Sequence, residues 1–267
     1  MEKISSIGIV FYNPVSLDNL HLDKILKSDI LVIIYFNSEV RNDLKLYFDF
    51  LINNNSNIIF LGDNLNVGLS KAYNIICDHA ILRKRHNILL LDQDTIICPD
   101  KLLRFTFPFP INENIVCANI VGGELSSQYT LKNSGFIINN GNVLFLDSYS
   151  KIGPFNESYF VELVDYEFQF RILREGYSFF LIYGTGIFNH ILNQGFSKII
   201  ILGVNVNLKL YSNRRIKEYS FSSVRLISTL FKHFQFKELL GFLNQALIQL
   251  FIIISHRILW KIFRVRV

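Results

Sequence analysis

The sequence predicts an α/β protein built on a mainly parallel sheet, followed by a basic helical segment at the C-terminal end. In the first half of the chain, short apolar runs rich in β-branched residues alternate with segments of helical periodicity. The 267 residues are 50% hydrophobic and 18% charged, with a mean hydropathy of +0.29, which is sufficient for a large core. This composition excludes a disordered, a collagen-like or a disulfide-knotted chain.

The first half is expected to contain four strands separated by three helices. The strands are expected at 4–12, 30–36, 58–61 and 87–91. The helices are expected at 17–27, 40–52 and 68–83. Nearly continuous apolar strands that alternate with helices are typical of a parallel sheet covered on both faces. Because ligands of such sheets bind at the carboxyl ends of the strands, the polar residues that follow these strands are candidate site residues.

A different pattern begins at about residue 115, where Gly, Asn and Ser separate shorter apolar runs. Strands or hairpins are expected at 115–121, 135–138 and 143–146. Residues 159–175 have helical spacing, and Gly176 is placed as a C-cap. Residues 178–183 form another expected strand.

The charge of the chain is divided unevenly between its two parts. Residues 207–267 hold 11 Lys and Arg against 2 Asp and Glu, a net charge of +9, whereas residues 1–206 carry −4. We therefore expect one domain over 1–205 and an extension over 206–267. Residues 239–255 are mostly apolar, with Asn244, Gln245 and Gln249 as interruptions, and basic residues interleaved with Trp, Ile and Phe follow them. This pattern favours a helix at an anionic membrane surface. A packed helical hairpin and a true span are the alternatives.

The three cysteines and the N-terminus are consistent with a reducing compartment. Cys77, Cys98 and Cys117 form no CxxC pair, so they supply neither a zinc ligand set nor a disulfide framework. The N-terminal residues lack the basic and apolar regions of a secretory signal. We expect a cytoplasmic protein held peripherally at the inner face of the cell membrane.

Two carboxylates follow the fourth expected strand, in the sequence Asp92-Gln93-Asp94. Two such groups at one sheet edge repel each other unless a cation lies between them, and hard cations such as Mg²⁺ or Mn²⁺ prefer oxygen ligands. The pair is thus a candidate metal site for a nucleoside diphosphate. The alternative is a solvated loop in which one Asp caps the next helix.

A second acidic cluster contains Glu162 and Asp165. On a helix these two positions share a face, and Asp165 is a candidate general base. The alternative is an ordinary acidic helix start favoured by the macrodipole.

A third candidate segment lies at the start of the helix expected at 68–83. Asn66 or Ser70 is expected to cap this helix, and Gly68 allows close approach to a ligand.

Several motifs in order resemble the family 2 glycosyltransferases of the GT-A fold, and their pattern is similar to rhamnosyltransferase-like bacterial members. The resemblance covers roughly residues 5–215, and it implies a nucleotide-sugar half at about 1–95 and an acceptor half at about 96–205 within the domain expected over 1–205. It is carried by Tyr12-Asn13-Pro14, by Asn66-x-Gly68-Leu69-x-x-Ala72-x-Asn74, by Leu-Leu-Leu-Asp92-Gln93-Asp94, and by Gly153-Pro154-Phe155-Asn156-Glu157 followed by Asp165, Glu167 and Arg171.

The resemblance implies a role for each matching position. It makes Asp94 the main metal ligand, supported by Asp92 and His190, and Asp165 the catalytic base. Arg171 would be a structural partner of nearby acids. Phe36 stands where many members have an Asp that contacts the base, which leaves uracil or thymine open. The remaining candidates are Tyr12, Asn13, Asn37, Asn66, Gly68, Lys71 and Asp92 on the donor side, and Ser134, Gly135 and Glu162 on the acceptor or sugar side.

The activity implied by the resemblance is an inverting, metal-dependent sugar transfer. The expected donor is a UDP- or dTDP-sugar carrying rhamnose or another hexose. The expected acceptor is a glycan hydroxyl, lipid-linked, in capsule or O-antigen biosynthesis. Mg²⁺ or Mn²⁺ is the expected cofactor, and a homodimer is also considered. The +9 segment is too apolar for nucleic-acid binding. The alternative function is a non-catalytic nucleotide-sugar-binding protein that retains the GT-A fold.

Overall fold

The computed structural model describes residues 2–14, 22–190, 196–201, 204–209 and 211–263. The chain divides into two compact units, Met1–His190 and Ile191–Val267. The boundary expected at residue 205 falls inside strand β12 (Val204–Lys209), so the hairpin of β11 (Phe196–Ile201) and β12 belongs to the second unit.

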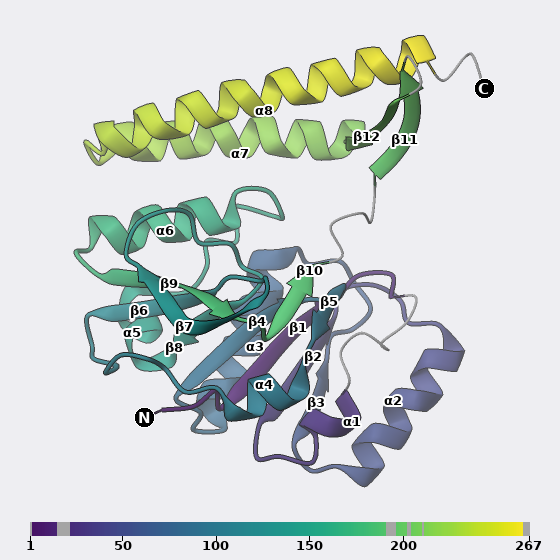
Figure 1. The fold of residues 1–267 in the computed structure, drawn as a ribbon, viewed down its shortest axis with the longest axis vertical. Helices are drawn as coiled ribbons and strands as arrows, with labels where there is room; N and C mark the ends of the chain where they lie inside the picture. Colours follow the sequence, from purple (N-terminus) through teal and green to yellow (C-terminus); the bar gives the residue numbers. More distant parts are fainter. Residues whose placement is uncertain (1, 15–21, 191–195, 202–203, 210, 264–267) are drawn as a thin grey trace. The chain divides into compact units, whose positions relative to one another are not determined.

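The first unit is built on a mixed, mostly parallel sheet of eight strands in the order β3-β2-β1-β4-β8-β6-β9-β7 (Figure 1). Strands β1 to β4 are mutually parallel, β8 is antiparallel to both of its neighbours, and β6 is parallel to β9. This confirms the predicted fold class. The strand bounds are β1 Ser6–Phe11, β2 Leu31–Phe36, β3 Ile58–Leu61, β4 Asn87–Asp92, β6 Ile115–Ile120, β7 Leu125–Lys132, β8 Asn142–Phe145 and β9 Ser178–Thr185.

Helices cover both faces of the parallel strands, as the apolar strand sequences predict. On one face, Phe48 of α2 packs against Phe11 and Phe36 of β1 and β2. On the other face, α3 lies close to β1, since a Cβ added to Gly8 would meet Ile76 at 2.5 Å. The helix bounds are α1 Leu22–Ile25, α2 Asn42–Asn54, α3 Leu69–Leu82, α4 Pro99–Arg104, α5 Leu146–Ile152 and α6 Val164–Arg174.

Three expected elements differ from the structure. Residues 135–138 form no strand, and the polar, exposed strand β7 precedes them instead. Helix α6 begins at Val164 rather than at 159, because Leu163 adopts a left-handed conformation. Its end is confirmed, since Gly176 has φ +76° and its N–H donates to Leu173 O. Of the helix expected at 17–27, only the part from Leu22 is described.

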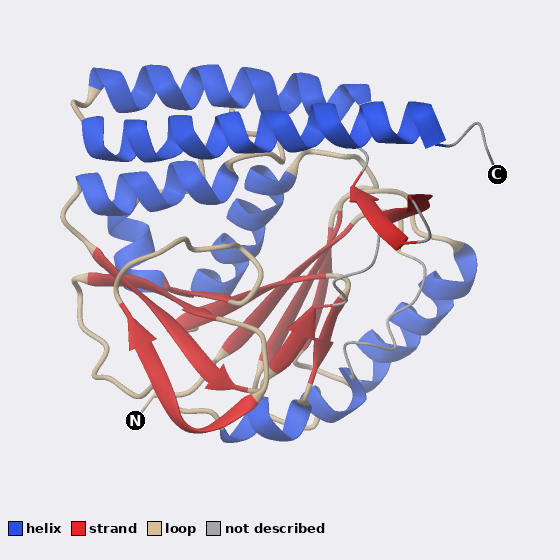
Figure 2. Cartoon of the chain, turned by 45° about the horizontal axis from the view of Figure 1, so that its top comes forward, coloured by secondary structure: helices blue, strands red, loops and turns tan. Residues whose placement is uncertain are grey.

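The second unit contains the β11–β12 hairpin and two long helices that lie side by side (Figure 2). These are α7 (Asn213–Lys232) and α8 (Phe236–Phe263). The apolar segment expected at 239–255 is therefore part of a longer helix. By length and composition alone, Phe236–Ile262 would be able to cross a membrane, and 11% of its most apolar window is buried. Arg264 and Arg266 of the basic end lie outside the described residues.

Candidate functional site

The Asp92-Gln93-Asp94 segment forms the turn between β4 and the short strand β5 (Thr95–Ile97). Asp92 is the last residue of β4 and pairs with Val10 of β1. Both carboxylates therefore lie at the carboxyl edge of the parallel strands, which is where α/β sheets bind their ligands.

Two amide side chains hold this turn, and neither stands out as a site residue in the sequence. The Oδ1 atom of the buried Asn140 accepts from the Asp92 N–H (3.0 Å) and from the Thr95 hydroxyl (2.9 Å). Gln93 bonds the backbone of Tyr12 in both directions, since Tyr12 N–H donates to Oε1 (2.7 Å) and Nε2 donates to Tyr12 O (3.1 Å). The backbone on either side of Asp94 is therefore fixed before any ligand binds.

Asp92 is exposed as a residue, although protein surrounds its carboxyl group on most sides. The pKa of Asp92 is raised to about 6, mainly by desolvation and then by the charges of Asp94 and Asp165, in that order of importance. After desolvation, the charges of Asp92 and Asp165 also raise the pKa of the buried Tyr73 phenol on α3. The structure thus brings Asp165 into the electrostatic range of the Asp92–Asp94 pair, across more than seventy residues of chain.

Asp165 lies in the first turn of α6. Desolvation is the main reason why its pKa rises to about 6, and the Glu162 charge adds to the rise, whereas bonds from backbone N–H groups lower it. The prediction that Glu162 and Asp165 share a helix face is wrong, because α6 begins after Glu162. Glu162 acts on Asp165 through its charge from the preceding turn.

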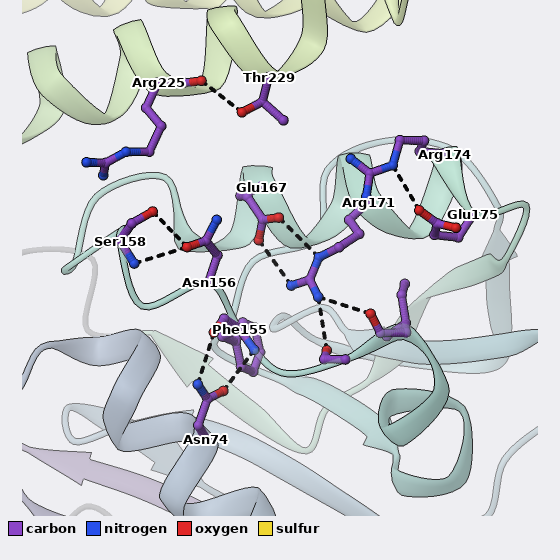
Figure 3. A network of polar contacts seen from close by, with 12 residues as sticks. Asn74, Phe155, Asn156, Ser158, Glu167, Arg171, Arg174, Glu175, Arg225 and Thr229 are labelled. Atoms are coloured by element: carbon purple, nitrogen blue, oxygen red, sulfur yellow. Dashed lines mark hydrogen bonds and ion pairs between the residues drawn. The ribbon is translucent and has the colours of Figure 1, made fainter. Parts of the chain in front are cut away.

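A polar network anchors this turn and α6 to the rest of the unit (Figure 3). Asn74 of α3 bonds Phe155 in both directions, with distances of 3.0 and 2.8 Å. Arg171 makes two bonds of 3.1 Å to the Glu167 carboxylate, and its Nη1 donates to Ile152 O and Gly153 O. The structural role predicted for Arg171 is confirmed, and the network fixes the start of α6 that carries Asp165.

The donor-side candidates on the loops after β1 and β2 have mainly structural contacts. The N–H of Asn13, which has φ +47°, donates to the Ser38 hydroxyl (2.6 Å), and Tyr12 is exposed beside it. Asn37 is buried, and its Oδ1 accepts from Val67 N–H (2.8 Å). Phe36 is part of an aromatic core with Phe48, so its ring is not available to stack on a base.

The helix start at Gly68 differs from the expected one. Gly68 itself occupies the N-cap position, and neither Asn66 nor Ser70 caps α3. Asn66 accepts from Gly68 N–H (3.1 Å), and the Ser70 hydroxyl donates to Tyr159 O. Gly68 has φ +87°, and a Cβ there would meet Phe160 at 2.6 Å, so the close approach is to the chain itself. Lys71, in the first turn of α3, is exposed.

Two other segments carry the acceptor-side candidates Ser134 and Gly135 and the remaining metal-ligand candidate, His190. Ser134 and Gly135 lie on the exposed turn after β7, and Gly135 has φ +118°. His190 ends strand β10 (Phe188–His190), which pairs with β5 so that His190 lies opposite Thr95. Its backbone is therefore next to the Asp92–Asp94 turn, while its side chain lies outside the described residues.

The donor set at Asp92 and Asp94 fits a hard divalent cation. Their oxygens are the ligands that Mg²⁺ and Mn²⁺ prefer, and the repulsion that raises the Asp92 pKa would be relieved by a positive ion. Within the described ranges, no group of three or more His, Cys, Asp or Glu is placed to hold a metal ion. Water and phosphate oxygens would then complete the coordination, which is usual for Mg²⁺.

Comparison with known proteins gives matches at the level of structure only. No protein-family model and no curated protein matches the chain. GalNAc-T7, in a structure with UDP, GalNAc and Mn²⁺, superposes with a TM-score of 0.54 at 11% identity, over 67% of this chain and 42% of that one. This likeness shows the fold, and the chain has the GT-A fold of glycosyltransferases.

Two further solved structures are similar at lower scores. TarS residues 1–349 from S. aureus gives a TM-score of 0.48 at 12% identity, over 68% of this chain and 59% of that one. The mannosyltransferase PcManGT from Pyrobaculum calidifontis, in complex with GDP-Man and Mn²⁺, gives a TM-score of 0.48 at 14% identity, over 88% of this chain and 64% of that one. The chain spans less than two thirds of the length of each of these three proteins.

Proposed function

We propose that the chain is an inverting glycosyltransferase that moves a sugar from a nucleoside-diphosphate sugar to a hydroxyl group. The observation that carries the proposal is that the charge of Asp165 on α6 reaches the Asp92–Asp94 pair at the edge of a GT-A sheet, where burial and then the charges of Asp94 and Asp165 raise the Asp92 pKa. Structural ion pairs lower carboxyl pKa values, whereas sites built to hold a cation or a proton raise them.

Asp165 is the proposed general base. It takes the proton of the acceptor hydroxyl as that oxygen forms a bond to the anomeric carbon, while the bond from that carbon to the diphosphate oxygen breaks. The electron pair of the broken bond leaves with the nucleoside diphosphate. Asp94 and Asp92 would hold Mg²⁺ or Mn²⁺, which would supply positive charge to offset that on the diphosphate. His190 is proposed as a further ligand on the strength of its position opposite Thr95.

The donor side is proposed to involve Tyr12, Asn13, Asn66 and Lys71, with Asn37 and Gly68 shaping the loop between them. Asn37 holds the Val67 backbone, and Gly68 allows α3 to start against Phe160. Lys71 is an exposed cation in the first turn of α3, where it is able to reach an anionic group. Ser134, Gly135 and Glu162 are the proposed acceptor-side residues.

Thermal unfolding with nucleotide sugars tests this proposal. Ligands that bind the native state raise the Tm, so UDP- and dTDP-sugars are screened with and without Mn²⁺ or Mg²⁺. We expect one class to raise the Tm in a metal-dependent way. Asp94→Asn should lose that dependence while its Tm without ligand stays close to that of the wild type. An equal shift in Asp94→Asn would contradict the metal assignment.

Turnover separates the enzyme from a binding protein. We expect release of the nucleoside diphosphate from the donor that gives the Tm shift. Asp165→Asn should bind that donor as tightly as the wild type and lose at least 100-fold in turnover, as expected for a general base. Binding without any release of diphosphate would instead indicate a non-catalytic nucleotide-sugar-binding protein.

We further propose that the second unit holds the protein at an anionic membrane surface, where a lipid-linked acceptor for capsule or O-antigen synthesis would be found. Seven large apolar side chains of α8 are exposed at helical spacing along one stripe. The segment over 207–267 carries +9, which complements an anionic leaflet. The stripe consists of Phe236, Leu240, Leu247, Phe251, Ile254, Ile258 and Ile262.

A further inference from the structure

An exposed aromatic ring packs on the residue that follows the proposed catalytic base, and it lies outside the core. Phe136 packs on Tyr166 of α6, with 4.7 Å between the ring centroids and 39° between the planes. Tyr166 in turn contacts Phe170, one helical turn further on. Phe136 remains 43% exposed, so one side of its ring is supported by protein while the rest is open to a ligand.

The position of Phe136 is fixed by a buried side chain rather than by its own packing. Gln169, which is 4% exposed, donates from Nε2 to Gly135 O (2.8 Å) and accepts at Oε1 from Ile137 N–H (2.8 Å). The two bonded residues flank Phe136 on either side. A segment that the sequence predicts as a strand is therefore held on α6 by two hydrogen bonds to a buried side chain, and its exposed ring is preorganised.

This segment runs along the same face of α6 that carries Asp165. Asp165 and Gln169 are four residues apart, so they are neighbours on the helix surface. The Tyr166 N–H also donates to Asp165 Oδ1 (3.0 Å). The ring pair and the base are thus held by one element, at neighbouring positions in its first turn.

We propose that Phe136, backed by Tyr166, is the platform for the sugar ring of the acceptor. The proposal rests on the function proposed above and adds the substrate class, a pyranose-bearing acceptor. The apolar C–H face of a pyranose is able to cover an aromatic face, while its hydroxyl groups stay free for polar contacts. A hydroxyl of a ring bound there would be directed to the base, and Gln169 is a positioning residue for the platform.

Kinetics with two readouts test the platform. In the wild type, transfer to a series of methyl pyranosides is compared with hydrolysis of the donor by water, which needs no acceptor. We expect Phe136→Ala to raise the acceptor KM at least tenfold while the rate of donor hydrolysis and the donor KM stay within twofold. Phe136→Tyr should restore the acceptor KM. Ile138→Ala, an equally exposed residue of the same segment, is the matched control and should change neither.

A binding measurement that does not depend on turnover complements the kinetics. Trp260 is the single tryptophan, so Phe136→Trp in a Trp260→Phe background places the only indole at the platform. Methyl pyranosides should shift or quench its emission in a saturable way, whereas the open-chain alditol mannitol should not. The same titration with Gln169→Ala added should be at least fivefold weaker, because the segment is no longer clamped.

The outcomes separate the two proposals. An unchanged acceptor KM in Phe136→Ala, in an enzyme that transfers sugar, would overturn the platform and leave the activity intact. A rise in the donor KM instead would overturn it by moving the ring to the donor side. A wild type that binds a nucleotide sugar but neither hydrolyses nor transfers it would overturn the proposed function, and the platform with it.

Discussion

Asp165 determines the expected acid limit of activity. A general base has to be deprotonated, so activity is present above its pKa and is lost as the pH falls through about 6. Asp92 has a similar pKa and is affected by the Asp165 charge. The acid limb of the pH–activity profile, where activity falls with pH, therefore reflects the coupled titration of both carboxyl groups.

Changing one nearby charge should move this limb. Glu162→Gln removes a negative charge that raises the Asp165 pKa, so the limb in kcat/KM should move to lower pH. Glu175→Gln is the matched control, since this residue is at the other end of α6 and bonds Arg174. Identical pH profiles for Glu162→Gln and the wild type would exclude Glu162 as a charge that acts on the base.

Asn140 offers a second test at the level of single residues. Asn140→Leu would leave the Asp92 N–H and the Thr95 hydroxyl without their shared acceptor, at a cost of about 1–3 kcal/mol in unfolding free energy. The Tm shift produced by the donor and metal should also shrink. The neighbouring Asn139→Leu is the control, because its buried Oδ1 has no hydrogen-bond partner among the described residues. Equal losses for the two variants would contradict a specific role for Asn140.

The site residues that the sequence reveals are those whose neighbours along the chain identify them. Asp92 and Asp94 stand out because a buried apolar run precedes them, and Asp165 because ordered motifs surround it. Asn140 and Gln169 are ordinary polar residues in the sequence. Their importance comes from bonds to segments more than thirty residues away, and no periodicity records such contacts. The role of Phe136 likewise comes from a contact with a distant residue, Tyr166, which the sequence does not record.

At the scale of elements, sequence patterns predict the buried strands well and the exposed ones poorly. A strand such as β2 is apolar at every position because helices cover both faces, so its pattern is unambiguous. Strand β7 is exposed throughout and reads as a polar loop. Residues 135–138 show the reverse error, because their apolar side chains suggest a strand whereas their backbone is bonded by Gln169 instead of a neighbouring strand.

Helix α6 carries two ion pairs that allow a matched comparison (Figure 3). Arg171 and Glu167 are both mostly buried, so Arg171→Ala leaves a buried carboxylate unpaired and should cost about 3–5 kcal/mol in unfolding free energy. Arg174 pairs with the largely exposed Glu175, and Arg174→Ala should cost about 0–1 kcal/mol. Urea denaturation of the two variants measures the difference. Similar costs would mean that the Arg171 network does not hold the start of α6.

At the scale of the whole molecule, the two units have charges of opposite sign and different surfaces. The first unit contains the three aspartates whose charges converge at the sheet edge. The second unit carries the excess positive charge and a stripe of exposed apolar side chains on α8. The sequence predicted this contrast from residue counts, whereas the stripe emerges only from the exposure of each helical position.

Vesicle flotation tests whether the stripe on α8 contacts lipid. We expect the full chain to float with vesicles of anionic phospholipid, to bind zwitterionic vesicles more weakly, and to be released in part by salt. The triple variant Leu240→Gln, Leu247→Gln, Phe251→Gln should bind the vesicles about tenfold or more weakly, since each substitution removes a large apolar side chain from the stripe.

The control for flotation uses exposed apolar residues of the first unit. Leu46→Gln with Phe50→Gln on α2 removes side chains that are 73% and 60% exposed, and this variant should float like the wild type. If the stripe instead joins two copies of the chain, the wild type will sediment as a dimer and fail to float, and the α8 variant will become a monomer. Apolar burial drives both kinds of contact, so binding to lipid is the measurement that distinguishes a membrane surface from a dimer interface. A wild-type dimer that fails to float would replace the membrane proposal with a dimer interface.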